Sequence, residues 1–406
     1  MSDLQRPGAD WELQFMVAGC AEKGIPIEIV GSGSKRAVGR PIENAMTITT
    51  ASLRGVTLYE PSELVMSARA GTPLSAIEAE LAARGQMLAF EPIDIGPATG
   101  TAHGTQTIGA VFATNLSGAR RIHSGAARDH LLGIKGVNGR AELFQSGGRV
   151  MKNVTGYDVA RGLSGSWGTL AIMTEVTFKV VPWPETAATL IYLNLPDNIA
   201  VELLCAAMAQ PVEVSGAVHL QAPLAARLSH PGLKTMSKSV TALRLENFSG
   251  AVTARKQKLK EALKVYGKAL ELDHRETLEF WSELRRLSVL PYRQTLLWRI
   301  ATKPTMAAKL VQAIKRYMPA EALYDWAGGL VWLEVPATAD AGTVEIRRAA
   351  AIHGGHATLI RAERSVRASV EVFQPLSPAL ERLTRGLKAA FDPAGILNPG
   401  RMYANV

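Results

Sequence analysis

Glycine-rich and serine-rich segments of the kind that bind phosphate groups occur twice in this chain of 406 residues. The first, Gly-Ser-Gly-Ser-Lys at 31–35, directly follows a strand expected at 27–30. The second runs from Thr107 to Gly118, and small residues recur in it every few positions. Because glycine has no Cβ, main-chain N–H groups in such segments can approach an anionic ligand closely. Both segments therefore predict contacts with a phosphate or diphosphate group.

A second group of turns lies further along the chain. The polar residues 152–158 lead to the glycine turn 165–168, and an alternating pattern then predicts a strand at 173–180. The edge of such a strand can hydrogen-bond a heterocycle through its main chain. This order of turn, turn and strand favours a binding site for a larger ligand that carries both phosphates and a ring.

These motifs resemble those of a known family. The segments TIGAVFATNLSG (107–118), RDHLLGIKGVNGR (128–140), KNVTGYDVARGLSGSWGTLAIMTEVTFKVVP (152–182) and FDPAGILNPGRMY (391–403) are similar to the vanillyl-alcohol oxidase, or PCMH-type, family of FAD-binding flavoproteins. Within that family the chain is most similar to subunits of bacterial glycolate oxidase. One departure concerns Ser166 to Ala171, which reads SWGTLA. Relatives of the catalytic D-subunit class usually read SEGTLG there.

The resemblance implies an FAD cofactor and a set of residues that bind it. Those residues are Gly31, Ser32, Gly33, Ser34, Lys35, Pro97, Thr107, Ile108, Gly109, Ala113, Thr114, Asn115, Ser117, Gly118, Gly156, Tyr157, Gly168, Thr169 and Ile172. Relatives with a histidyl-linked flavin carry the histidine after the first glycine loop, where this chain has Ser34-Lys35. His103 is the nearby alternative, and we interpret it as a hydrogen-bonding loop residue. We therefore expect the FAD to be non-covalent.

The pattern of elements predicts an α+β fold. We expect a two-subdomain PCMH-type FAD-binding domain at 1–185, with subdomains at about 1–90 and 91–185. A cap or substrate domain, an antiparallel sheet with helices, follows at 186–375, and a C-terminal helix and segment at 376–406 return to the FAD domain. In the FAD domain, periodicity predicts helices at 8–24 and 74–84, and Asn138-Gly139 predicts a hairpin turn between strands 131–137 and 141–145. Proline and tryptophan at 182–184 indicate a linker.

Alternating strands and helices fill the remainder of the chain. We expect cap strands at 189–195, 214–220, 239–246, 294–301, 322–325, 329–335 and 356–361, and cap helices at 199–209, 250–266, 304–317 and 340–352. A final helix is expected at 378–391. In the resembled family the cap covers the flavin and shapes the substrate site.

Composition restricts the classes of function. The chain has only two cysteines, Cys20 and Cys205, which are too few to ligate an iron–sulfur cluster. The formal net charge of +9 is compatible with an acidic partner, nucleic acid or anionic lipid, but most of the basic residues are scattered, which favours solvated surfaces. The sequence has no apolar run of membrane-spanning length and no signal-peptide pattern at its N-terminus, so we expect a cytoplasmic protein.

A few residues are candidates for substrate chemistry. A substrate carboxylate would need an arginine fork, and Arg293, Arg299 and Arg361 lie on expected cap strands. The catalytic residues stay unknown, and these arginines are weak candidates. Arg120-Arg121 could neutralise phosphate or lie on the surface. His353-Gly354-Gly355-His356 is interpreted as an ordinary turn, so no metal site is expected.

Two functional hypotheses follow from the resemblance. In the first, the chain is the FAD-binding subunit of a glycolate or D-2-hydroxyacid dehydrogenase (oxidase) complex and passes electrons to an iron–sulfur partner. In the second, it is a non-catalytic FAD-binding or structural subunit that supports a catalytic sister flavoprotein, which Trp167 and the lack of cap histidines favour. A nicotinamide-dependent reductase is a weaker alternative. We expect a catalytic flavoprotein subunit and an iron–sulfur subunit as partners, no nucleic acid, and peripheral membrane association at most through partners.

Overall fold

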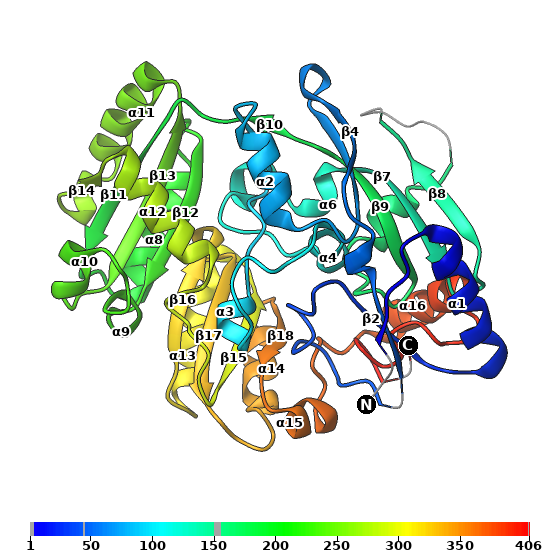
Figure 1. Cartoon of the computed structure of the whole chain (residues 1–406). Coiled ribbons are helices and arrows are strands. Elements are labelled where there is room, and N and C mark those ends of the chain that lie inside the picture. The colour runs from blue at the N-terminus through cyan, green and yellow to red at the C-terminus, as the bar shows by residue number, and fades with distance from the viewer. Residues whose placement is uncertain (1–3, 44, 150–155, 405) are drawn as a thin grey trace.

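The computed structural model of the protein describes residues 4–43, 45–149, 156–404 and 406. The chain divides into two regions of sheet and helix that lie next to each other (Figure 1). One contains the N-terminal and C-terminal segments, and the other contains a large antiparallel sheet. The predicted α+β class is therefore confirmed.

The N-terminal elements place the first glycine loop at the end of a small sheet. Helix α1 (Asp10–Lys23) buries Leu13, Val17 and Cys20 and ends at Gly24, whose φ of 63° is the left-handed conformation that glycine adopts readily. The strands of this sheet are parallel, in the order β1-β3-β2, and comprise β1 (Leu4–Gln5), β2 (Ile27–Val30) and β3 (Met46–Thr49). Strand β2 runs directly into residues 31–35.

A second sheet in this region is antiparallel. Its order is β4-β5-β9-β7-β8, formed by β4 (Val56–Glu60), β5 (Val65–Arg69), β7 (Leu131–Asn138), β8 (Leu143–Gly147) and β9 (Ala171–Lys179). The hairpin expected at Asn138-Gly139 is present between β7 and β8. Strand β5 pairs with β9 along its length, so this sheet crosses the subdomain boundary expected near residue 90.

Helices and short strands cover this sheet and its edges. Helix α4 packs on β5 and β9 through Ile108, Val111 and Phe112, which belong to one apolar cluster with Met66, Val176 and Phe178. The elements are α2 (Leu74–Ala82), β6 (Gln86–Met87), α3 (Gly96–Thr99), α4 (Ile108–Thr114), α5 (Arg121–Ser124), α6 (Ala127–His130), α7 (Val159–Leu163) and β10 (Val181–Pro182). The run from Thr107 to Gly118 is therefore a helix followed by a turn.

The cap is built on a single sheet. Adjacent strands in it are antiparallel, and their order in the sheet differs from their order in the chain. Within the described residues its order is β14-β11-β13-β12-β16-β17-β15-β18. Its strands are β11 (Thr186–Leu193), β12 (Val214–Leu220), β13 (Val240–Asn247), β14 (Leu270–Leu272), β15 (Thr295–Ala301), β16 (Glu321–Asp325), β17 (Leu330–Pro336) and β18 (His356–Arg361). The sequence analysis found all of these except β14.

Helices line the cap sheet. They are α8 (Asp197–Met208), α9 (Ala222–Ala225), α10 (Pro231–Thr235), α11 (Ser249–Ala262), α12 (His274–Arg285), α13 (Ala307–Lys315), α14 (Thr343–Ile352) and α15 (Arg364–Ser369). Short 3-10 turns occur at Thr50–Ser52, Pro61–Glu63, Lys264–Tyr266, Pro304–Met306 and Trp326–Gly328. Helix α12 was missed, although an Asp273–Glu276 capping box marks its start.

The C-terminal segment packs on the N-terminal region, the part at 1–185 for which the sequence predicts FAD binding and which we call the FAD region. Helix α16 (Pro378–Phe391) leads into a segment that lies beside β2. There Leu397 bridges Ile27, and the main-chain N–H of Asn398 donates to the carbonyl of Ile27 at 2.9 Å. Residues almost a whole chain apart therefore meet at the first glycine loop.

A buried polar network within the cap makes its stability sensitive to acid. The Asp197 carboxylate accepts hydrogen bonds from the Tyr324 hydroxyl at 2.7 Å, from the Gln221 side-chain amide at 2.5 Å and from Nε2 of His219 at 3.3 Å. Burial by itself would raise the pKa of Asp197, but hydrogen bonds from His219, Tyr324 and Gln221 outweigh burial and lower it to about 2. The folded state therefore favours the ionised carboxylate.

We expect this network to lose its stabilising effect in acid. Because the folded pKa lies below the ordinary value of 3.8, the contribution is present above about pH 4 and disappears as the pH falls toward 2. A shift of this size corresponds to about 2 kcal/mol. Urea unfolding at pH 5.5 and pH 2.5 should show that Asp197→Asn loses less stability between the two pH values than the wild type. The matched control is Glu185→Gln, at an exposed carboxylate, and an equal pH dependence of all three proteins would refute the assignment.

Candidate functional site

A cleft lies between the end of β2, helix α4 and the C-terminal segment. Its lining residues come from six places in the chain, namely Ile29 to Arg36, Thr50, Ala70, the α4 residues Gly109, Ala110, Ala113 and Thr114, the residues Trp167, Gly168 and Ala171 to Met173, and Asn398 with Arg401. The two glycine-rich segments, the start of β9 and the C-terminal segment therefore meet around one space.

The loop after β2 offers unused hydrogen-bond donors to this cleft. Within the described part of the chain, the main-chain N–H groups of Ser32, Gly33 and Ser34 donate no hydrogen bond. Gly33 has a φ of 87°, a conformation that a side chain would strain. Successive free N–H groups in a turn of this kind form a concave site for anions. The loop is thus suited to a diphosphate.

Lys35 adds a buried cation beside these donors. Its side chain is 7% exposed, and its Nζ donates to Oε1 of Gln106 at 2.8 Å. Burial lowers the pKa of Lys35 to about 8, and the nearby Asp94 carboxylate opposes that shift. A bound phosphate would favour the protonated form further. Lys35 is therefore a cation at neutral pH that still has donor capacity for an anion.

Thr107 and Arg401 carry buried polar atoms that lack a partner. Among the described residues, the Thr107 hydroxyl and Nε of Arg401 make no hydrogen bond. A Cβ added at Gly31 would overlap the Thr107 hydroxyl, so the two loops are in direct contact at this point. Because an unsatisfied buried donor is costly, such atoms indicate a missing ligand or water. The donor set fits a diphosphate.

The C-terminal segment supplies residues that the sequence analysis did not place in the site. Arg401 donates from Nη2 to the carbonyl of Lys35 at 2.9 Å, which fixes the first loop. Asn398 accepts from the N–H of Ile29 at 2.8 Å and donates to the carbonyl of Trp167 at 2.7 Å. The NPGRMY motif was the signal that could have identified them, because its residues cross the end of β2.

The proposed FAD-binding residues do not all line this cleft. Those that do are Gly31, Ser32, Gly33, Ser34, Lys35, Gly109, Ala113, Thr114, Gly168 and Ile172. Ile108 packs in the core beneath α4, and Thr169 is buried beneath α16 with its carbonyl bonded to Lys388. Pro97 and Gly118 lie where the FAD region meets the cap, bonded through their carbonyls to Tyr292 and Trp326.

Two more of these residues, Asn115 and Ser117, have local structural roles. Asn115 ends α4 with a φ of 51° and accepts from the N–H of Arg128 at 3.0 Å. Ser117 accepts from the N–H of Ala127 at 3.0 Å. Gly156 and Tyr157 are exposed, with Tyr157 at 93%. Most of the polar turn at 152–158, namely residues 152–155, lies outside the described residues.

Gly109 lines the cleft, and its contacts with Ala70 explain why a glycine is needed there. An added Cβ would come within 2.6 Å of the Cβ of Ala70, and the N–H of Gly109 already donates to the carbonyl of Ala70 at 2.9 Å. The glycine therefore allows α4 to approach strand β5 closely. Its backbone positions the cleft wall and does not offer a free amide.

A second group of functional side chains surrounds Trp326, where the cap meets the FAD region. The Trp326 indole N–H donates to the carbonyl of Gly118 at 2.9 Å. The guanidinium carbons of Arg121 and Arg299 lie 4.5 and 5.1 Å from the centre of the Trp326 ring. Trp326 and Ala327 hold φ values of 54° and 57°, which cost of order 1–3 kcal/mol each. Strain of this kind concentrates at functional sites.

Arg299 differs from the other two arginine candidates. Within the described residues its side chain makes no hydrogen bond or ion pair, and its guanidinium stacks on Trp326 and Trp332. Burial and the charge of Arg121 together lower the pKa of Arg299 to about 10, against the opposing effect of Asp325, so the guanidinium is protonated at neutral pH. Its forked donors are therefore free to bind an anion.

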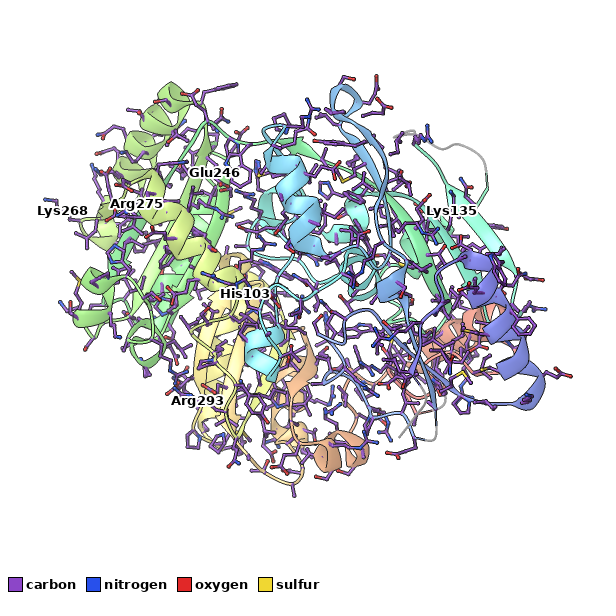
Figure 2. All side chains as sticks on the ribbon, in the orientation of Figure 1. His103, Lys135, Glu246, Lys268, Arg275 and Arg293 are labelled. Carbon is purple, nitrogen blue, oxygen red and sulfur yellow. The ribbon has the colours of Figure 1, made fainter. Side chains whose placement is uncertain are left out.

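Arg361 and Arg293 are placed differently. Arg361 is 4% exposed and pairs with Glu334 at 2.7 Å, and it also donates to the carbonyls of Ala98 and Thr295 at 2.9 Å. It therefore holds the cap against the FAD region. Arg293 is exposed at the surface, in the loop before β15 (Figure 2). Of the three, only Arg299 is half-buried with free guanidinium donors.

Asp325 is a buried acid beside this group that the sequence analysis missed. It is 6% exposed and accepts a hydrogen bond from the N–H of Trp326 at 2.7 Å. Burial raises the pKa of Asp325 to about 7, and the Trp326 N–H, Arg244 and Arg299 only partly oppose that effect. Because its pKa is raised, Asp325 is a weaker counter-charge for Arg299 than an exposed carboxylate would be.

The pair Arg120-Arg121, for which phosphate and surface roles stayed open, has two other roles. Arg120 is buried and pairs with Glu246 at 2.5 Å, and Glu246 is labelled in Figure 2. Arg121 stacks on Trp326. A further pair between Arg244 and Glu91 at 3.0 Å also joins the cap to the FAD region.

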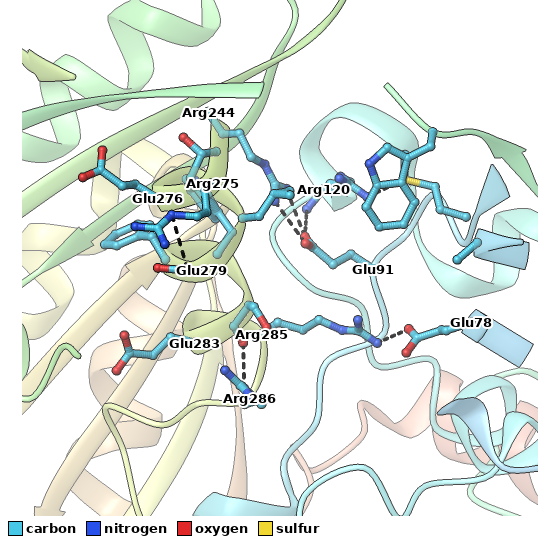
Figure 3. Close-up of a pocket in the computed structure, with 18 of the residues that line it drawn as sticks. Glu78, Glu91, Arg120, Arg244, Arg275, Glu276, Glu279, Glu283, Arg285 and Arg286 are labelled. Carbon is cyan, nitrogen blue, oxygen red and sulfur yellow. Dashed lines mark hydrogen bonds and ion pairs between the residues drawn. The ribbon is translucent and has the colours of Figure 1, made fainter. Parts of the chain in front are cut away.

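A larger cavity of about 900 Å³ opens between α2 and α12. Figure 3 shows that charged side chains from both regions project toward it. Several of them are already paired, as Arg244 is with Glu91 and Arg285 with Glu78. Neither Lys35 nor the two glycine-rich segments line it.

The histidines do not form a metal site within the described residues. Among the described residues, no group of three or more histidine, cysteine, aspartate or glutamate side chains is arranged to hold a metal. His103 is 60% exposed, with Nδ1 3.8 Å from Asp94 (Figure 2). Burial lowers the pKa of His356, and the charges of Arg299 and Arg121 lower it further.

Comparison with known proteins gives a family and a fold. Residues 5–147 match the family described as FAD binding domain. The chain is 35% identical to the glycolate oxidase subunit GlcE of Escherichia coli (strain K12) over 94% of this chain and 93% of that protein. It is 26% identical to the glycolate oxidase subunit GlcD of Bacillus subtilis (strain 168), over 97% and 87% of the two chains. FAD is therefore the cofactor of this chain.

Solved structures support the same architecture. p-Cresol methylhydroxylase with substrate bound has a TM-score of 0.73 at 15% identity, over 99% of this chain and 88% of that chain. Alkyldihydroxyacetonephosphate synthase has a TM-score of 0.69 at 16% identity, over 98% and 76% of the two chains. These similarities confirm the predicted PCMH-type fold. No helix among the described residues is long and apolar enough to span a membrane.

Proposed function

Because the chain belongs to the family of glycolate oxidase subunit GlcE, within the PCMH-type FAD-binding flavoproteins, we propose that it is the FAD-binding subunit of a complex that oxidises glycolate or another D-2-hydroxy acid. Its family makes the chain an FAD-linked oxidoreductase.

The free guanidinium of Arg299 is the observation that supports a substrate with a carboxylate. It lies next to Trp326, whose indole is bonded to Gly118 at the end of the second loop. A 2-hydroxy acid brings one carboxylate, and a protonated arginine without a carboxylate partner can bind it through two parallel hydrogen bonds. Both neighbouring tryptophans are buried, Trp326 at 8% and Trp332 at 0% exposure, and an ion pair beside such apolar surface is stronger than in bulk water.

FAD would supply the redox chemistry by accepting a hydride from the α-carbon of the acid. The residues of this chain would bind FAD and the substrate and orient them toward each other. Ser32, Gly33, Ser34 and Lys35 would hold the diphosphate, together with the Thr107 hydroxyl. Arg299 would fix the substrate carboxylate, and Arg121 would reinforce the positive potential from the opposite side of the seam between cap and FAD region.

We propose that electrons leave through an iron–sulfur partner. The chain has only two cysteines, and neither has a second thiol close in sequence. A cluster of the usual four-cysteine type would therefore belong to another subunit. The names of the two glycolate oxidase relatives, each called a subunit, agree with an assembly of several chains.

An anaerobic titration tests the proposal. The purified chain with bound FAD is mixed with glycolate or D-lactate, and the loss of flavin absorbance is followed with the chain alone and in its native complex. Bleaching by either acid is expected in the complex. A flavin in this chain that stays oxidised in both preparations would refute the proposed function.

A second function, support of a catalytic sister flavoprotein, is favoured by Trp167. This residue lines the FAD cleft with a φ of 55° and packs edge-on against Phe373 at 5.4 Å between ring centres. A bulky indole replaces the carboxylate that catalytic D-subunit relatives usually carry there. If Trp167 prevents turnover, the titration should bleach only flavin bound to the sister subunit.

A further inference from the structure

Helix α16 is amphipathic, yet the structure exposes its apolar face. Leu380, Leu383 and Leu387 are 53%, 66% and 51% exposed. At about 100° per residue, the three leucines lie within about 60° of one another around the helix. They form a continuous stripe, which we name the leucine face. An exposed apolar stripe of this kind marks an interaction surface.

The opposite side of α16 explains why the leucines point outward. Lys388 is 8% exposed, and its Nζ donates to the carbonyls of Thr169 and Leu397, both at 2.8 Å. It also pairs with the fully buried Asp392 at 2.9 Å. These contacts fix the rotation of the helix, so the leucine face cannot turn inward without breaking a buried ion pair.

Charges next to the leucine face indicate the chemistry of its partner. The Arg382 side chain, about 100° around the helix from Leu383, is exposed and makes no hydrogen bond or ion pair among the described residues. Arg140 is also exposed, and it lies beside the end of α16, where it donates to the carbonyl of Ala390 at 3.2 Å. Neither arginine has a carboxylate partner within the described chain, so the edge of the face is positive.

A second apolar pair lies on the neighbouring helix. Trp11 and Phe15 on α1 are 67% and 78% exposed. Both helices contact one turn, because Gln14 of α1 donates to the carbonyl of Ala141 and Arg140 donates to α16. Figure 1 shows α1 and α16 at the same end of the FAD region, away from the cap.

We propose that the leucine face of α16 is the docking surface for a sister subunit of the same oxidase, which presents an apolar helix face bordered by carboxylates. The proposal rests on the proposed function. A second copy of this chain fits less well, because it would bring another net charge of +9 and the same unpaired arginines to the contact. An acidic partner instead neutralises Arg382 and Arg140, while the leucines supply most of the affinity.

The test replaces leucines on the outer side of the helix. The full-length double variant Leu383→Asp, Leu387→Asp is expressed in the native host in place of the wild type. We expect it to bind its sister subunit at least about 30-fold more weakly than the wild type does, and to keep its FAD. The matched control is Ile352→Asp on α14 of the cap, where the side chain is 72% exposed. It should stay in the complex.

A photo-crosslinker at position 383 identifies the occupant. A crosslink to an apolar helix of a stoichiometric subunit, flanked by Asp or Glu, supports the proposal, and Arg382→Glu should then slow association. A crosslink to a second copy of this chain or to lipid overturns it. The proposal is also overturned if the double aspartate variant stays in the complex, or if the wild-type chain purifies without a partner. Flavin bleaching by glycolate is measured on the same samples, so failure of docking and failure of the proposed function give different results.

Discussion

Replacing Gly31 with valine is expected to lower the affinity of the chain for FAD by about 5- to 150-fold. The added Cβ would overlap the hydroxyl of Thr107 and push apart the two loops that form the cleft. Overpacking of this kind costs about 1–3 kcal/mol, which gives that range of affinities. Equilibrium dialysis or flavin fluorescence with the refolded chain measures the effect.

The control for this prediction is Gly250→Val. Gly250 lies on the exposed start of α11 in the cap, and an added Cβ there meets no atom within 4 Å. This variant should bind FAD as the wild type does. Equal FAD affinities for the Gly31 and Gly250 variants, both folded by circular dichroism, would show that the cleft is not the diphosphate site.

Replacing Arg299 with methionine is expected to reduce the rate of flavin reduction by a 2-hydroxy acid, measured as kcat/KM, by about 30- to 5,000-fold. Loss of one partner from a buried charge pair costs about 2–5 kcal/mol, which corresponds to this range. Methionine keeps much of the length of the side chain, so Trp326 and Trp332 retain a packing partner. FAD content should stay near one per chain.

Two further variants distinguish a substrate contact from a structural effect. Arg299→Lys keeps the positive charge but loses the forked pair of donors, so its kcat/KM should lie between those of the methionine variant and the wild type. Arg293→Met removes an exposed arginine just before the same strand and should behave as the wild type. If the Arg299 and Arg293 variants have equal kcat/KM values, Arg299 does not bind the substrate carboxylate.

Local signals in the sequence were enough to predict most of the elements. Gly24 ends α1 because only a left-handed residue fits there, and Asn138-Gly139 joins β7 to β8. Strand β14 was missed because its three residues are too few for an alternating pattern, whereas α12 was missed although Phe280, Trp281 and Leu284 recur on one buried face. The pairing of β5 with β9 also depends on contacts distant in sequence, which local patterns do not contain.

The residues of the first glycine loop could be predicted from the sequence, but the side chains around Trp326 could not. Glycine and serine at 31–35 indicate free amides directly, because their spacing determines the turn. The distinction between Arg299, Arg361 and Arg293 was not predictable, since it depends on which strand neighbours and carbonyls surround each guanidinium. Asp325 and Trp326 were missed for the same reason. Their roles come from a strained turn that brings the cap to Gly118.

The most direct test of the central claim counts the flavin that the substrate reduces. The native complex is purified with wild-type chain and with the Gly31→Val chain, and each is titrated with glycolate without oxygen. Our account predicts that the glycolate-reducible FAD falls by one equivalent per copy of this chain when Gly31 is replaced. An unchanged amount of glycolate-reducible FAD, in a complex shown to have lost the FAD of this chain, would contradict it.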